Sequence, residues 1–245
     1  MCHTMYPTVI FFILVCFGAK VDVGQASQAE MIADISQKVN QLYDVLLQGT
    51  QDSTNRTIYA ICNLQPNPKL NSSDLKITGQ VLLKQTYPYG NLEAVFTVEG
   101  FPMDANQSVR AIHIHSYGDL SNGCDSAGGH YNPFSVNHPD HPGDFGNFRV
   151  RNGKIQQHLT NLEANLFGPY SAVGKSIVVH KLADDLGKGD NQASLENGNA
   201  GARLACCVIG SSSKTNWDKY MQDNAMLKNP RVSRRVKQQR SKNYS

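Results

Sequence analysis

Histidines gather in the middle of this 245-residue chain, where five of the eight lie between positions 113 and 141. His113 and His115 stand two apart in an apolar run, so on a strand both imidazoles leave the same face. Two imidazoles held on one face form a rigid half-site for a metal ion. His180 ends a second apolar run, 176–179, and is a candidate third ligand.

A second group of ligand types follows in a loop rich in Pro and Gly. His138, His141 and Asp144 recur at intervals of three and offer two nitrogens and one oxygen, a set that zinc accepts in tetrahedral geometry. Each group is one ligand short of four, and a deprotonated His130 could complete both, one metal on each ring nitrogen. An all-imidazole set suits copper. The predicted ligands are His113, His115, His130 and His180 for a copper ion, and His130, His138, His141 and Asp144 for a zinc ion.

The elements that must position these ligands are short strands. Between positions 57 and 212, apolar runs alternate with Gly, Pro and Asn, and Arg151-Asn-Gly-Lys154 is typical of a tight hairpin turn. This pattern predicts an all-β fold, a Greek-key antiparallel β-barrel or sandwich. Two long connections, 116–145 and 183–201, are expected to carry function. Strands are predicted at 77–85, 92–99, 110–115, 146–150, 154–160, 176–182 and 202–209.

The N-terminal segment 1–26 has the pattern of a signal peptide. Its apolar run, 9–17, is far shorter than the roughly 20 residues that span a bilayer, so no membrane span is expected. Small residues that suit cleavage follow the run. A buried strand is the alternative interpretation, but the cysteines and glycosylation sequons described below favour secretion to the extracellular space or matrix.

Residues 27–49 are predicted to form a short amphipathic helix, which a polar linker to position 56 separates from the barrel. Its apolar side chains recur at spacings of 3, 4, 3 and 4, as in a coiled-coil seam. We expect this helix to join copies of the chain into a dimer or tetramer; a helix packed on its own domain is the alternative. The seam consists of Ile32, Ile35, Val39, Leu42 and Leu46.

Four cysteines remain once the signal is removed: Cys62, Cys124, Cys206 and Cys207. An even number in an exported chain predicts two disulfides. Neighbouring side chains on a strand point to opposite faces, so Cys206 and Cys207 should each take one of the two distant cysteines. Candidate glycosylation sequons begin at Asn55, Asn71, Asn106 and Asn243.

The segment 213–245 is predicted to hold a short helix, 217–227, and then a basic tail. No acid follows Asp223, whereas seven of the 23 Lys and Arg residues do. Such a patch binds polyanions, which outside the cell are sulfated glycosaminoglycans such as heparan sulfate; secretion argues against nucleic acid, and a merely solubilising tail is the alternative. The predicted polyanion-binding residues are Lys228, Arg231, Arg234, Arg235, Lys237, Arg240 and Lys242.

Longer motifs around the ligands resemble the Cu/Zn superoxide dismutase family. The likeness covers roughly residues 60–210, and the N-terminal helix, the added Cys62 and the basic tail are similar to the extracellular branch of that family. The motifs are Ala111-Ile-His-Ile-His-Ser-Tyr-Gly-Asp119, Gly123-Cys124, Ser126-Ala-Gly128, His130-Tyr-Asn-Pro133, Val178-Val-His180, Ala183-Asp-Asp-Leu-Gly-Lys188 and Gly198-Asn-Ala-Gly-Ala-Arg-Leu-Ala-Cys206.

This resemblance implies conversion of superoxide to dioxygen and hydrogen peroxide by alternate reduction and oxidation of copper. It assigns catalytic roles to three residues: His130 would carry a proton, Arg203 would attract the anion, and Asp184 would hydrogen-bond ligands of both metals. It also implies the disulfides Cys124–Cys206 and Cys62–Cys207.

Three features depart from the family pattern. The zinc loop is shorter than in intracellular members, Glu196 stands where they commonly carry lysine, and the tail lacks a cysteine that some extracellular members use to cross-link subunits. Two alternative functions are a copper carrier without turnover and a zinc-stabilised adhesion domain that binds no copper. The full ligand set together with Asp184 and Arg203 favours an enzyme.

Overall fold

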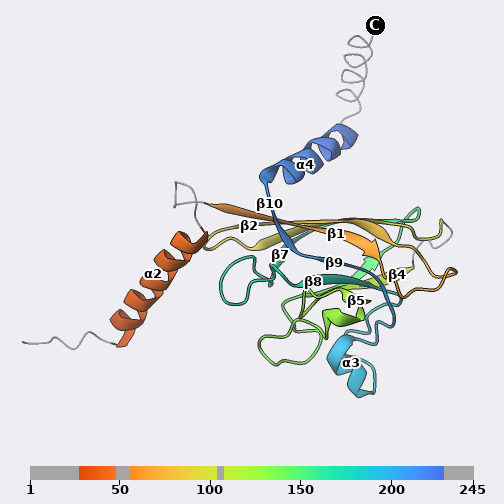
Figure 1. Ribbon diagram of the computed structural model, residues 1–245, viewed down its shortest axis with the longest axis horizontal. Coiled ribbons are helices and arrows are strands. Elements are labelled where there is room, and N and C mark those ends of the chain that lie inside the picture. The colour runs from red at the N-terminus through yellow and green to blue at the C-terminus, as the bar shows by residue number, and fades with distance from the viewer. Residues whose placement is uncertain (1–27, 48–55, 104–107, 229–245) are drawn as a thin grey trace, which may run out of the picture. The chain divides into compact units, whose positions relative to one another are not determined.

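The structure is a computed structural model that describes residues 28–47, 56–103 and 108–228. Its contacts divide the chain into two units, Met1–Gln51 and Asp52–Ser245. The described part of the first unit is one helix, α2 (Gln28–Leu47), and the second unit holds the sheet and the remaining helices (Figure 1). Among the described residues, no helix is long and apolar enough to cross a membrane.

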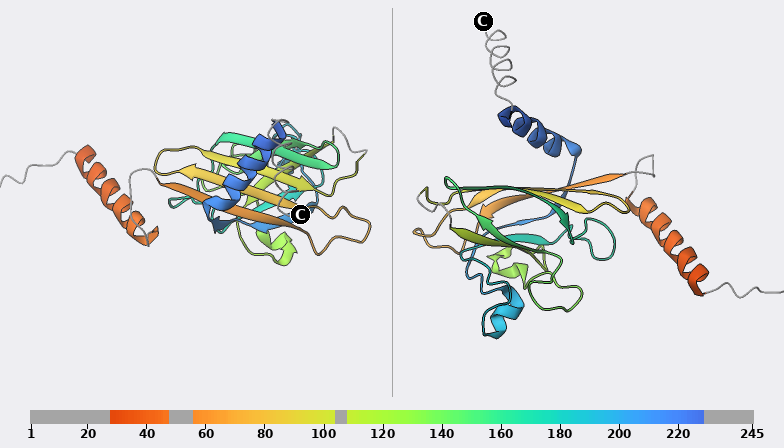
Figure 2. Two further views of the ribbon diagram at one scale, coloured as in Figure 1. Left: turned by 90° about the horizontal axis from the view of Figure 1, so that it is seen from above. Right: turned by 180° about the vertical axis from the view of Figure 1, so that it is seen from behind.

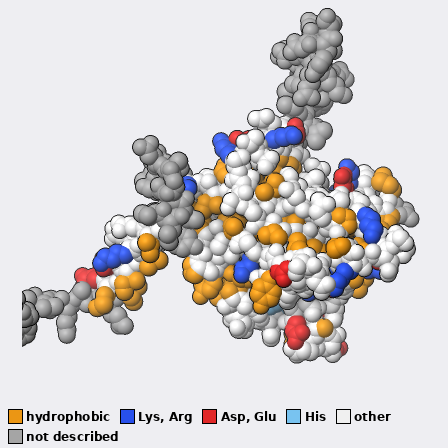
Figure 3. Space-filling model, in the orientation of Figure 1, with side chains coloured by type: hydrophobic (Ala, Val, Ile, Leu, Met, Phe, Trp, Pro, Cys, Tyr) orange, Lys and Arg blue, Asp and Glu red, His pale blue; other side chains and the backbone are white. Residues whose placement is uncertain are grey.

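Helix α2 matches the helix predicted over 27–49 to within two residues at each end. The seam residues Ile32, Ile35, Val39 and Leu42 are between 52% and 61% exposed, and Figure 3 shows hydrophobic side chains gathered along the helix. The side chain of Leu46 lies outside the described residues. Within its own unit, the apolar seam is therefore uncovered.

The second unit confirms the predicted all-β class. Among its described residues, nine strands form one sheet, in the order β6-β4-β8-β9-β1-β2-β3-β7 with β10 beside β1, and the strand pairs are antiparallel. The sheet curls into a nearly closed barrel (Figures 1 and 2). The strands are β1 (Thr57–Pro66), β2 (Thr78–Thr86), β3 (Leu92–Glu99), β4 (Val109–His115), β5 (Ser121–Cys124), β6 (Asp144–Arg149), β7 (Lys154–Leu162), β8 (Ser176–His180), β9 (Arg203–Val208) and β10 (Gly210–Ser212).

Several strand ends differ from the prediction by one or two residues, and at two of them, in β8 and β6, the register is irregular. Strand β8 ends at His180 rather than at position 182, since its register against β9 shifts between Val179 and His180. Strand β6 begins at Asp144, two residues before the predicted start, because Asp144 pairs with His113 across a second irregularity. Both irregularities fall at predicted metal ligands and turn the ends of these strands toward the site.

The hairpin predicted at Arg151-Asn-Gly-Lys154 is confirmed. Asn152 has φ of 50° and Gly153 has φ of 71°, both in the left-handed region that a tight two-residue hairpin turn requires. Arg151 and Lys154 pair across this turn, and the backbone N–H of each donates to the carbonyl of the other. The turn connects β6 to β7, which stand at the two ends of the strand order.

Alternation along β4 separates the core from the metal ligands. Ile112 and Ile114 are fully buried in the main hydrophobic cluster, whereas His113 and His115 leave the opposite face and are also buried. The cluster includes Phe96 and Phe148, whose ring centroids lie 4.6 Å apart. A close-packed core behind the strand therefore holds the two imidazoles in place.

The two long connections between strands carry η1 (Asp125–Ala127) and α3 (Gln192–Asn197). Helix α4 (Lys214–Lys228) starts three residues before the predicted helix and packs on the outer face of the sheet, where Trp217 is 5% exposed against Leu82 and Val95. Figure 2 shows α4 crossing the strands, on the side of the barrel away from α3 and β5. The C-terminal segment therefore leaves the barrel opposite the two long loops.

Candidate metal centre

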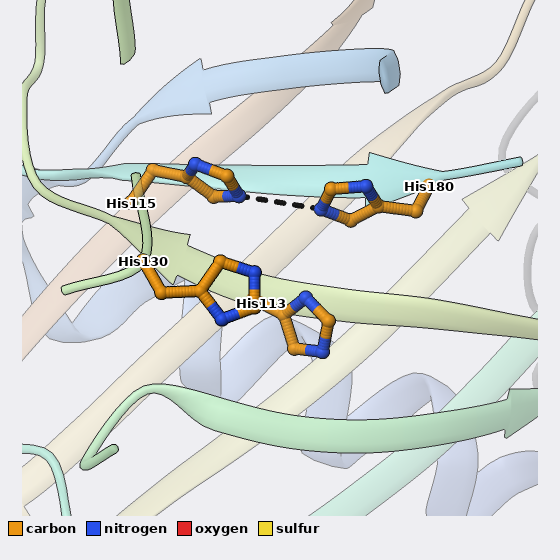
Figure 4. Close-up of side chains that lie close together, drawn as sticks. All are labelled: His113, His115, His130 and His180. Carbon is orange, nitrogen blue, oxygen red and sulfur yellow. Dashed lines mark hydrogen bonds between the residues drawn. The ribbon is translucent and has the colours of Figure 1, made fainter. Parts of the chain in front are cut away.

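Strand pairing brings three of the predicted ligands together. Strands β4 and β8 are neighbours, so the imidazoles of His113, His115 and His180 share one face (Figure 4). The loop after β4 returns to that strand, where the Ser116 hydroxyl donates to the carbonyl of His130 over 2.9 Å. A bridge between His115 and His130 completes this return. The backbone thus places the fourth imidazole against the other three.

These four imidazoles form one buried group. A ring nitrogen of each lies within 4.8 Å of a ring nitrogen of every other, and none of the four residues is more than 8% exposed. The Nε2 atoms of His115 and His180 are 3.2 Å apart, and the ring centroids of His113 and His130 are 4.2 Å apart. Four ring nitrogens that converge among buried side chains are the ligand set expected for copper.

Burial sets the charge of these imidazoles. It lowers the pKa of His180 to about 3 and that of His130 to about 4, the latter against the opposing effect of Asp144. It also holds the pKa of His115 well below the usual range. All three rings are neutral at pH 7, so their lone pairs are available to a metal ion.

The second predicted ligand set surrounds one carboxylate. Asp144 Oδ1 lies 3.0 Å from His130 Nδ1, and Asp144 Oδ2 lies 2.7 Å from His138 Nδ1 and 2.9 Å from His141 Nδ1. Burial raises the pKa of Asp144, but contacts with the three imidazoles outweigh it and hold that pKa well below the usual range. The Nδ1 atoms of His138 and His141 are buried and make no hydrogen bond despite these distances. Three nitrogens around one ionised carboxylate fit a zinc ion.

Asp184 joins the two ligand sets. Its Oδ2 accepts from His113 Nε2 over 2.8 Å, and its Oδ1 accepts from His138 Nε2 over 2.7 Å. Burial raises the pKa of Asp184, but hydrogen bonds from His113, His138 and the Leu186 N–H, together with electrostatic attraction to His113, hold that pKa well below its usual range. Each of these hydrogen bonds places a proton on Nε2 of its imidazole, so Nδ1 is the nitrogen left for a metal, and the Nδ1 atoms of both residues lack a hydrogen-bond partner.

The same division of the two ring nitrogens recurs in the other ligands. His115 Nδ1 donates to the Gly128 carbonyl over 2.8 Å and His180 Nδ1 to the Gly201 carbonyl over 3.2 Å, so Nε2 of each is left for a metal. His141 Nε2 donates to a backbone carbonyl and leaves Nδ1. Only His130 directs one nitrogen to each set, since its Nδ1 faces Asp144 and its Nε2 makes no hydrogen bond. Backbone and carboxylate acceptors thus fix which ring nitrogen each of the five other predicted histidine ligands offers to a metal. The residues fit two metals that share His130.

A cleft of about 380 Å³ opens beside His115 and His180, with Arg203 in its wall. The guanidinium of Arg203 donates over 2.7 Å to the carbonyls of Cys124 and Gly128. A guanidinium has five N–H donors, so further donors remain for an anion in the cleft. Gly128 accepts from both Arg203 and His115, which ties the cationic group to a predicted copper ligand.

Sequence reasoning missed two asparagines that hold this arrangement. Asn147 donates from Nδ2 to the Asp184 carbonyl and accepts from the Asp184 N–H, each over 2.8 Å. Asn67 donates from Nδ2 to the Arg203 carbonyl over 2.9 Å, and its Oδ1 accepts from the Cys124 N–H over 3.3 Å. The partners lie far away along the chain, so no local pattern pointed to either residue.

Two disulfides fasten the ends of strands that carry the site. Cys62 in β1 bonds Cys207, and Cys124 bonds Cys206, with Cα–Cα distances of 5.4 Å and 5.7 Å. Cys206 and Cys207 belong to different hydrophobic clusters, as the alternation along a strand requires. The second bond joins the loop that carries the Cys124 carbonyl to the strand that carries Arg203.

The remaining predicted sites are largely outside the described residues. Asn71 is exposed in the turn after β1, whereas Asn55, Asn106 and Asn243 are not described. Of the basic tail, Lys228 ends α4, and its side chain is outside the described residues. The rest of the predicted tail also lies outside them: Arg231, Arg234, Arg235, Lys237, Arg240 and Lys242.

Comparison with known proteins agrees with this geometry. The family model for copper/zinc superoxide dismutase (SODC) matches residues 77–209. Extracellular superoxide dismutase [Cu-Zn] of Oryctolagus cuniculus is 47% identical over 215 residues, which cover 87% of this chain and 88% of that protein. The protein of the same name from Mus musculus is 52% identical over 189 residues, 77% of this chain and 75% of that protein. The chain belongs to the copper/zinc superoxide dismutase family.

Proposed function

We propose that this protein is a secreted dismutase that converts superoxide to dioxygen and hydrogen peroxide by alternate reduction and oxidation of copper. The observation that carries this proposal is the position of His130, whose two ring nitrogens face two separate, buried ligand sets. The relatives, which are named extracellular copper/zinc superoxide dismutases, support both the reaction and the location.

The copper ion would be held by His113, His115, His130 and His180, and the zinc ion by His130, His138, His141 and Asp144. Bound copper would supply alternating one-electron reduction and oxidation, so that two superoxide ions and two protons yield one dioxygen and one hydrogen peroxide. Asp184 keeps protons on Nε2 of His113 and His138, which fixes both rings for metal binding.

We propose that His130 also moves a proton, and that it does so at Nε2. This atom makes no hydrogen bond within the described part of the chain, and the residue lines the cleft beside His115 and His180. The other nitrogen, Nδ1, faces Asp144 in the predicted zinc set, so the ring would keep its orientation when Nε2 takes up a proton. From there the proton is within reach of a peroxide leaving through the cleft.

Arg203 supplies the attraction for the anionic substrate. Its guanidinium lies in the wall of the cleft, held by two backbone carbonyls, and burial lowers its pKa without removing its charge at neutral pH. A fixed cation in a narrow cleft raises the local concentration of an anion and its encounter rate. Glu196 on the same rim opposes this attraction.

The test is superoxide decay catalysed by full-length protein loaded with copper and zinc, beside a His115→Ala variant. We expect copper-dependent turnover in the wild type and its loss in the variant. Metal content is measured in the same samples. Full occupancy by copper and zinc without turnover would establish the carrier function instead, and zinc without copper would establish the adhesion domain.

We further propose that the basic tail binds heparin-like polyanions. Helix α4, which precedes the tail in the chain, packs on the side of the barrel away from α3 and β5 (Figure 2). Removal of residues 229–245 should abolish retention on immobilised heparin. Retention of the full chain should weaken steeply as salt rises, because the attraction between exposed charges is screened. Equal retention of both proteins would leave the tail a solubilising role only.

We also propose that residues 27–56 form an oligomerisation segment between a signal peptide, 1–26, and the barrel, 57–212, with the polyanion-binding segment at 213–245. The exposed seam of α2 supports self-association, because burying Ile35 and Val39 against a second helix removes apolar surface from water. Deletion of residues 27–49 should lower the mass in solution, and an unchanged mass would contradict the proposal.

A further inference from the structure

Two clefts open over the metal centre. The first, of about 380 Å³, reaches the predicted copper ligands His115 and His180. The second, of about 300 Å³, reaches His141, which belongs to the zinc set alone. His130 and Glu196 line both clefts, so the shared imidazole and one carboxylate stand between two separate openings.

Helix α3 gives each cleft a different wall. Gln192, Leu195 and Glu196 stand at positions i, i+3 and i+4, which share one face of a helix, and all three line the second cleft. Asn197, at the end of the same helix, lines the first cleft and not the second. The helix therefore stands between the two clefts: Gln192 and Leu195 face the second alone, Asn197 faces the first alone, and Glu196 lines both.

The opposite wall of the second cleft is a closed turn. Asn132 accepts the Val136 N–H at Oδ1 over 3.1 Å and donates from Nδ2 to the Val136 carbonyl over 2.7 Å. The same carbonyl accepts from His141 Nε2 over 3.2 Å, which leaves His141 Nδ1 toward Asp144. The hydrogen bonds of Asn132 thus hold the turn that lines the second cleft, and the cleft ends at His141, a predicted zinc ligand.

The lining chemistry suits the passage of a cation. Side-chain oxygens come from Asn132, Asn137, Gln192 and Glu196, and the Glu196 carboxylate accepts from Gln192 over 3.0 Å. Zinc accepts carboxylate oxygens as ligands, and a lining with a carboxylate and, among the described residues, no Lys or Arg side chain attracts a hydrated cation. We propose that zinc enters and leaves its site through this second cleft, without passing the copper position. This inference rests on the proposed function, since it takes His130, His138, His141 and Asp144 as the zinc ligands.

The test is metal exchange in the holoenzyme, incubated with isotopically enriched zinc and copper and assayed by mass spectrometry of the desalted protein. Gln192→Trp obstructs the second cleft, and Asn197→Trp is the matched obstruction of the first. We expect Gln192→Trp to slow zinc exchange by about tenfold, as one bulky group adds to the barrier, and to leave copper exchange unchanged. Asn197→Trp should do the reverse. Leu195→Trp, on the same face as Gln192, is a second obstruction of the zinc route.

The opposite patterns would overturn the inference. If Asn197→Trp slows both metals and neither obstruction of the second cleft slows zinc, both metals use the first cleft. If no variant changes either exchange, the metals leave through opening of the loops, and the second cleft is not a route. Failure of the proposed function would be detected separately, because the metal content would show that the wild-type protein does not hold both metals before exchange is measured.

Discussion

The hydrogen bonds of the Asp184 carboxylate offer the sharpest test of how the protein orients its predicted metal ligands. Asp184→Asn keeps the shape but leaves one oxygen to accept from two ring N–H donors, those of His113 and His138, at 2.8 Å and 2.7 Å. The amide NH₂ would face the other donor. Both imidazoles are fully buried, so the one that loses its acceptor cannot turn to water. Loss of an outer hydrogen bond of this kind typically weakens metal binding by about 10- to 100-fold.

We therefore expect the zinc dissociation constant of Asp184→Asn to rise by about 10- to 100-fold, or roughly 1.4–2.7 kcal/mol. The assay is competition with a chromogenic chelator, together with thermal unfolding of the metal-loaded and metal-free forms. The stability gained on metal loading should shrink with the affinity. Asp190→Asn is the control, since it removes the same charge from an exposed position on the same loop. Zinc affinity equal in the two variants would refute the reasoning.

Three further predictions concern charge. Arg203→Gln should lower the rate of superoxide decay at low ionic strength by about tenfold or more while copper content is retained, because the cleft loses its fixed cation; an unchanged rate would exclude the role of Arg203. Glu196→Lys should raise that rate severalfold at low salt, and the gain should vanish near 1 M salt, where the Debye length falls to about 3 Å; a gain that survives high salt would exclude steering. In the metal-free protein, burial holds the pKa of His180 at about 3 and of His130 at about 4. The unfolded chain therefore binds more protons between pH 6.5 and 4, and the free energy of unfolding should fall as the pH is lowered through that window, as denaturant titrations at several pH values would show.

Most of the predicted metal ligands could be identified from the spacing of histidine and aspartate along the sequence. His113 and His115 could be placed on one face because a strand alternates, and the structure shows the matching alternation with Ile112 and Ile114 in the core. The three-residue intervals of His138, His141 and Asp144 likewise indicated one compact group. Local geometry was enough in both cases, because the residues that cooperate are near neighbours along the chain.

Contacts between distant residues were beyond the sequence pattern. Hydrogen bonds join Asn147 to Asp184 and Asn67 to Arg203 across sequence separations of 37 and 136 residues. They depend on which strands become neighbours. Strand β1 (Thr57–Pro66) was not predicted either, although Ala60, Cys62 and Leu64 alternate into the core. The second cleft depends on how α3 packs against the loop 132–137, which no periodicity encodes.

The most direct test of the shared ligand is electron paramagnetic resonance of protein in which copper also replaces zinc. If the two ring nitrogens of His130 join the two sites, the unpaired electrons on the two metals interact through the imidazole, and the signal of isolated copper should largely disappear. A His130→Ala variant that still holds both ions should show two independent copper signals. Independent signals in the wild-type protein would contradict the account.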